Sequence, residues 1–216
     1  MKKRFLLASL MGLMVPCVAL ANPFTFIEVS SNSLLYNVGS QLEVEVTGGS
    51  GYVDFKFTNN GPIASSITDI WFGNAYYFHK DTGVLDFGGF TSPVGVVSFQ
   101  EVTQGQYPAN IGGFTWDSYF TSGSTAPTSS NGINPYESLT LHFTYNTSLS
   151  LLSDIIGSLT DKDGEVTIGL HVQALPDGQS ERYENGPPVP EPATMLLFGT
   201  GLVGLAGIAR RKNNQE

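Results

Sequence analysis

The sequence predicts an all-β protein: a β-sandwich of the Ig-like or jelly-roll type with one short crossover helix, followed by a C-terminal transmembrane helix. Apolar and polar residues alternate with a period of two in several short segments, as they do in strands that bury one face. Gly-rich and Asn-Gly segments between them predict turns. A long apolar segment near the C-terminus predicts the transmembrane helix.

Seven to nine strands are expected in all, and six of them are assigned to residues 42–47, 52–57, 67–72, 94–102, 139–145 and 166–172. The first two flank a Gly-Gly-Ser-Gly turn and predict a hairpin. Apolar residues recur at helical spacing over 149–159 and predict the crossover helix. Residues 105–135 are rich in Gly, Ser and Thr, so we expect a long surface loop there.

The N-terminus has the layout of a secretory signal peptide over residues 1–21. Three basic residues precede an apolar segment, and Ala19-Leu20-Ala21 fits the small-residue pattern that signal peptidase cuts, so cleavage is expected after Ala21. A permanent N-terminal anchor is the alternative. The only cysteine, Cys17, lies within this segment. The mature chain would therefore have no disulfide, no thiolate nucleophile and no cysteine metal ligand.

The C-terminus carries an apolar segment that ends in a basic cluster. Residues 193–209 are uncharged and mostly apolar, and Arg210, Arg211 and Lys212 follow directly. As a helix this segment would be about 25 Å long at ~1.5 Å per residue, enough to cross a bilayer that thins slightly. The basic cluster predicts that residues 213–216 are cytoplasmic and that everything before residue 193 is outside. A buried core helix is the alternative.

Immediately before this segment stands Val189-Pro190-Glu191-Pro192. Residues 188–212, with this motif, a Gly-rich apolar segment and a basic cluster in order, resemble the PEP-CTERM sorting signal. The resemblance implies that a membrane-embedded exosortase, thought to be a cysteine protease, reads the signal in Gram-negative bacteria that make exopolysaccharide. It implies an inner-membrane intermediate with a periplasmic ectodomain, and then a surface or extracellular location. The residue before each proline favours an extended conformation, which suits a segment that a protease must bind.

The chain is expected to divide into an ectodomain over 22–175, a stalk or linker over 176–188, and the sorting signal over 189–212. Residues 22–188 contain four basic and seventeen acidic residues, a net charge of −13. Nucleic-acid binding is therefore excluded, because phosphate neutralisation needs Lys and Arg. An anionic polysaccharide would be repelled unless cations bridge the two.

One cofactor site and one ligand surface are suggested by the ectodomain sequence. Asp161 and Asp163, before Gly164, resemble the start of a calcium-binding loop, although the alternative is a simple Asp-Gly turn. Trp71 and Trp116 belong to aromatic clusters that could stack on sugar rings, and the alternative is that they are core residues. His142 and His171 are expected on the polar faces of their strands. No other cofactor is expected.

No familiar catalytic motif occurs, so we expect no enzyme activity. Two functions stay open. The first is a non-enzymatic envelope or extracellular protein, sorted by an exosortase and associated with exopolysaccharide or biofilm. The second is a carbohydrate-binding or carbohydrate-active domain delivered by the same route.

Overall fold

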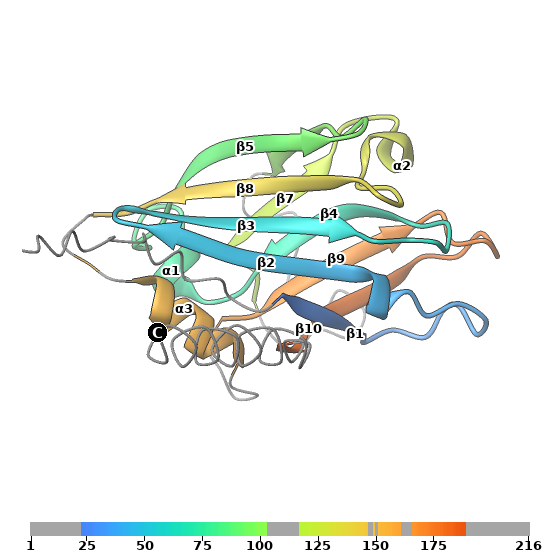
Figure 1. The fold of residues 1–216 in the computed structure, drawn as a ribbon, viewed down its shortest axis with the longest axis horizontal. Coiled ribbons are helices and arrows are strands. Elements are labelled where there is room, and N and C mark those ends of the chain that lie inside the picture. The colour runs from blue at the N-terminus through green and yellow to red at the C-terminus, as the bar shows by residue number, and fades with distance from the viewer. Residues whose placement is uncertain (1–22, 103–116, 147–148, 150, 161–165, 189–216) are drawn as a thin grey trace, which may run out of the picture.

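A computed structural model describes residues 23–102, 117–146, 149, 151–160 and 166–188. Within these residues ten strands form one sheet that curls into a nearly closed barrel (Figure 1). The strands are β1 (Phe24–Glu28), β2 (Leu42–Gly49), β3 (Tyr52–Asn59), β4 (Ser66–Phe72), β5 (Asp86–Val94), β6 (Phe99–Val102), β7 (Phe120–Ser124), β8 (Ser138–Thr144), β9 (Ile168–Gln173) and β10 (Glu181–Pro188). The helical segments are η1 (Gly39–Gln41), α1 (Ala75–Phe78), α2 (Thr128–Asn131) and α3 (Leu151–Thr160). The predicted all-β class is confirmed.

The sheet runs in the order β5-β8-β3-β2-β1-β10-β9-β4-β7-β6, and neighbouring strands are antiparallel. Its two halves face each other across an aromatic core, where the rings of Phe55 and Phe72 lie 4.9 Å apart. The arrangement differs from the expected sandwich of two separate sheets, because β1 and β10 join the halves by backbone pairing. Alternation reports that a strand has one buried face, and it carries no information on whether the sheet continues around the core.

The predicted hairpin is confirmed as β2 and β3, which pair in register from Leu42↔Asn59 to Gly49↔Tyr52. Its apolar positions, Leu42, Val44, Val46, Val53, Phe55 and Phe57, are all buried. The crossover helix is confirmed as α3, which buries one side chain per turn through Leu151, Ile155 and Leu159. This stripe packs α3 against β2 and β10.

Two segments expected to lie outside the sheet are instead strands within it. In the expected stalk over 176–188, residues 181–188 form β10, which lies between β1 and β9. Within the expected loop over 105–135, residues 120–124 form β7, which lies between β4 and β6. β7 was missed because Thr, Ser and Gly read as loop residues, whereas here these small side chains are buried. Residues 103–116 lie outside the described residues.

The described chain enters and leaves the barrel at one end. Phe24 at the start of β1 pairs with Pro188 at the end of β10. We call this end the α1 end, because α1 follows β4 there. The first residues of β5, β7 and β9 also lie at this end. The loop over residues 29–38 and the turn between β9 and β10 lie at the opposite end (Figure 1). The part of the chain that the structure describes contains no helix long and apolar enough to span a bilayer. The expected helix over 193–209 lies outside that part.

Candidate functional site

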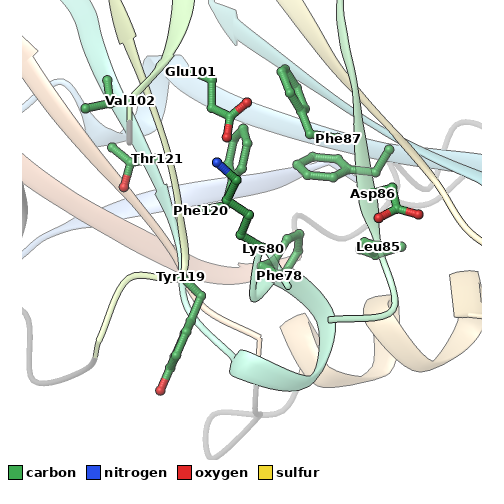
Figure 2. Close-up of a pocket in the computed structure, with 11 residues that line it drawn as sticks. Phe78, Lys80, Leu85, Asp86, Phe87, Glu101, Val102, Tyr119, Phe120 and Thr121 are labelled. Atoms are coloured by element: carbon green, nitrogen blue, oxygen red, sulfur yellow. The ribbon is translucent and has the colours of Figure 1, made fainter. Parts of the chain in front are cut away.

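The two edges of the sheet approach each other without pairing, and the seam between them holds a pocket. Phe90 of β5 and Phe99 of β6 face each other across this seam with ring centroids 6.2 Å apart. Towards the α1 end the seam opens into a cavity of about 190 Å³ (Figure 2). Eleven residues line it: Phe78, Lys80, Leu85, Asp86, Phe87, Glu101, Val102, Tyr119, Phe120, Thr121 and Phe143.

The floor of the pocket is aromatic. Phe87 of β5 reaches across the seam to Phe120 of β7, with centroids 4.7 Å apart, and Phe143 of β8 lies 5.1 Å from Phe120. These rings are the outermost layer of the aromatic core that fills the barrel. β5 and β7 are not neighbours in the sheet, and among the described residues no backbone hydrogen bonds close the gap above the rings. Part of this apolar surface therefore borders the pocket.

The rim of the pocket is charged. Lys80 follows α1, Asp86 begins β5 and Glu101 lies on β6, and all three residues are exposed. Figure 2 shows the Lys80 ammonium and the Glu101 carboxylate turned towards each other over Phe120. The pocket therefore offers an apolar surface below and both hydrogen-bond donors and acceptors above. This combination suits a small ring with one apolar face and several hydroxyl groups.

Two His–Asp pairs lie on the outer surface of the barrel, one on each half. His142 Nδ1 of β8 lies 2.6 Å from Asp54 Oδ1 of β3, directly opposite it in the register. His171 Nδ1 of β9 lies 3.0 Å from Asp69 Oδ2 of β4, again directly opposite. The two histidines lie on the polar faces of their strands, as predicted. Since β8 and β9 are not neighbours, each histidine serves as a cross-strand partner within its own half of the sheet.

Trp71 is buried on β4, with only 3% of its surface exposed. Its ring stacks on His171, with centroids 6.3 Å and planes 21° apart. A sugar ring would have to displace His171 to stack on this face. Trp71 is therefore packed against its neighbours in this structure, and the expected sugar-stacking platform stays a prediction. Trp116, the second platform residue, lies outside the described residues.

A buried carboxylate that sequence reasoning missed lies at the end opposite α1. Glu181 at the start of β10 is fully buried, and it accepts hydrogen bonds from the Ser33 amide and the Ser30 hydroxyl. Ser33 Oγ in turn donates to Asp177 Oδ2 at 2.6 Å. Burial, and secondarily the negative charge of Glu181, raises the pKa of nearby Glu28. The cluster ties loop 29–38 to β10. In the sequence it is indicated only by an acidic residue on the inward face of β10, a strand that the sequence analysis did not predict.

Tyr183, two residues further along β10, ties the same loop from inside the barrel. Its side chain is fully buried, and its hydroxyl accepts a hydrogen bond from the backbone N–H of Val38 at 3.1 Å. Burial raises the pKa of Tyr183 to about 12; the Val38 bond opposes this effect, and Glu28 and Glu181 add to it. Tyr183 is therefore a structural residue at physiological pH.

The remaining predicted sites lie outside the described residues. These are Ala19 and Ala21, Asp161 and Asp163, the motif Val189, Pro190, Glu191 and Pro192, and the basic cluster Arg210, Arg211 and Lys212. The calcium loop therefore stays a prediction. Among the described residues, no group of three or more His, Cys, Asp or Glu side chains is placed to hold a metal ion.

Comparison with known families identifies the C-terminal segment. The family model of the PEP-CTERM protein-sorting motif matches residues 188–212, which confirms the resemblance and confines it to that segment. The motif marks the chain as an exported protein that an exosortase sorts, with a membrane-anchored intermediate. No curated protein and no solved structure matches the chain.

Proposed function

We propose that this protein is a non-enzymatic component of the cell envelope or extracellular matrix, delivered by signal peptidase and an exosortase and associated with exopolysaccharide or biofilm. The observation that carries the proposal is the sorting motif at residues 188–212, which continues directly from the last strand of a folded β domain. The expected N-terminal signal peptide and the acidic, cysteine-free ectodomain of the protein also support a function outside the cytoplasm.

Delivery is tested by following the full chain in a host that carries an exosortase. Replacing Pro190-Glu191-Pro192 with three alanines should leave the protein in the inner-membrane fraction, whereas the wild-type chain should reach the surface or medium. Replacing Pro176 alone with alanine is the matched control, because this proline is exposed in the turn between β9 and β10, far from the motif. If the triple-alanine variant reaches the medium as the wild type does, the proposed sorting is wrong.

Matrix association is tested separately, with the domain of residues 22–188 and exopolysaccharide isolated from the producing cells. We expect the domain to co-sediment with the polysaccharide, and added divalent cations to strengthen the association if the polymer is anionic. A domain that stays in the supernatant at all cation concentrations would contradict matrix association and leave the delivery proposal standing.

A second candidate, a carbohydrate-binding domain, is favoured by the seam pocket. Its aromatic floor can cover the apolar face of a pyranose ring, and Glu101 and Asp86 can accept hydrogen bonds from sugar hydroxyls while Lys80 donates to ring or hydroxyl oxygens. The size of the cavity suits one sugar unit, either at a chain end or as a branch.

Calorimetric titration of the domain with oligosaccharides cut from the same polysaccharide tests this candidate. Glu101→Gln and Lys80→Ala should each weaken binding about tenfold, the effect of losing roughly 1.4 kcal/mol. Lys56→Ala is the matched control, because Lys56 is exposed on β3 and lies outside the pocket. Equal binding by all three variants would exclude the pocket as the sugar site.

A further inference from the structure

The sorting motif begins where the sheet ends, with no spacer between them. Pro188 is both the last residue of β10 and the first residue of the matched motif. β10 is an interior strand: residues 181–184 pair with β9 on one side, and residues 183–188 pair with β1 on the other. The segment that an exosortase must read is therefore attached to the middle of the sheet.

This attachment limits how far the motif can lie from the barrel. Glu191 is three residues beyond Pro188, and an extended chain spans at most about 3.6 Å per residue, so Glu191 lies within ~11 Å of the end of β10. A single α-helix with its side chains is about 10–12 Å wide. An enzyme that encloses the motif must therefore contact the α1 end of the barrel.

From Asn185 onward, the backbone of β10 pairs with β1 only. Asn185 pairs with Phe26 and Pro188 with Phe24 of β1, with an irregular register between them, and neither pairs with β9. Pro187 and Pro188 have no N–H to donate to the ladder. On the β9 side, the backbone N–H of Ile168 donates instead to the side-chain oxygen of Asn185, at 2.7 Å. The last four residues of β10 are thus the part of this strand that can separate first.

We propose that β1 and the exosortase compete for residues 185–188, so that separation of this strand end from β1 controls the rate of sorting. Proteins that read extended peptides commonly do so by pairing with the peptide backbone. An enzyme that pairs with the backbone groups of residues 185–188 that face β1 must displace β1 from them. The folded domain thus slows sorting without preventing it. This inference rests on the proposed function.

The test inserts Gly-Ser-Gly-Ser-Gly-Ser between Pro188 and Val189 in the full chain, in a host with an exosortase. The linker gives the enzyme residues to bind that do not belong to the sheet. We expect pulse-chase labelling to show conversion to the released form about threefold faster or more, the factor that corresponds to ~0.7 kcal/mol of strand separation. The control carries the same linker between Gly95 and Val96, which are exposed in the turn between β5 and β6 at the opposite end of the barrel, and should be sorted at the wild-type rate.

A second variant leaves the length of the chain unchanged. Asn185→Ala removes the side-chain acceptor of the Ile168 amide and should also speed sorting, while circular dichroism confirms that the domain is folded. A linker variant sorted at the wild-type rate would overturn the proposal. A slower linker variant would overturn it as well, because it would show that the barrel end assists the enzyme. If even the wild-type chain is not sorted, the proposed function fails, and this inference fails with it.

Discussion

The buried hydroxyl of Tyr183 allows one prediction to be worked out in both sign and size. At pH 7, Tyr183→Phe leaves the N–H of Val38 without its acceptor, and Val38 is itself fully buried. Leaving a buried donor unsatisfied costs about 1–3 kcal/mol. The variant should therefore have a free energy of unfolding lower by that amount. Tyr76→Phe is the matched control, because Tyr76 is 57% exposed on α1.

At high pH the free energies of unfolding of the wild type and the variant should converge, or the variant should become the more stable protein. The pKa of Tyr183 is about 12 in the folded state and 10.0 for the unperturbed side chain. Below pH 10 both states hold the proton, so the group makes no pH-dependent contribution to stability. Above pH 10 the unfolded chain loses this proton first, so wild-type stability falls, and the loss approaches about 2.7 kcal/mol as the pH passes 12, at ~1.36 kcal/mol per pKa unit. The phenylalanine variant lacks this loss.

Urea unfolding of residues 22–188, followed by tryptophan fluorescence from pH 7 to pH 12, measures the difference. All other groups are the same in the two proteins, so their contribution cancels when the variant is compared with the wild type. The stability advantage of the wild type should shrink steadily above pH 10. If the two proteins instead lose stability in parallel up to pH 12, the hydroxyl is not buried as described and the reasoning is refuted.

Three further predictions concern the stability of the domain. Phe72→Ala, in the centre of the aromatic core, should cost about 3–5 kcal/mol, and a loss below ~1 kcal/mol would contradict the packing. Glu181→Ala should cost about 2–3 kcal/mol by leaving the Ser33 amide unsatisfied, and a neutral result would show that this carboxylate does not hold loop 29–38. A chain that ends at Pro188 should fold cooperatively, whereas one that ends at residue 180 should be unfolded by circular dichroism, because it lacks an interior strand. Cooperative folding of the shorter chain would show that β10 is dispensable.

Alternation in the sequence predicted the strands with the simplest environments. β2, β3, β8 and β9 bury aliphatic or aromatic residues at every second position, and polar residues or glycine stand between them, so the period of two was visible. β10 was missed because its inward residues begin with Glu181, a carboxylate whose burial depends on donors about 150 residues away. Two prolines at its end added a linker-like signal.

The seam pocket was beyond local sequence reasoning for a different reason. Its charged residues Lys80 and Glu101 come from segments that no strand pairing joins, and only the curling of the sheet brings them together. The closure of the sheet depends in turn on the pairing of Phe24 with Pro188, a contact across almost the whole described chain. The sorting motif could be predicted because it is defined by the order of three sequence features: the Pro-Glu-Pro residues, the apolar segment and the basic cluster. That order can be read without knowing the fold.

The seam also determines how this protein behaves at high density. An open sheet has two edges that could template pairing with another chain, and extended edges of this kind promote aggregation. In this protein the pairing of β5 shifts register on both sides of Phe90, and the strand also contains Pro93 and Ser92, whose φ is 49°. β6 has four residues and includes the charged residue Glu101. Within the described residues, neither edge offers a long, regular row of donors and acceptors. Concentrated copies of this protein are therefore protected against joining edge to edge into continuous sheets.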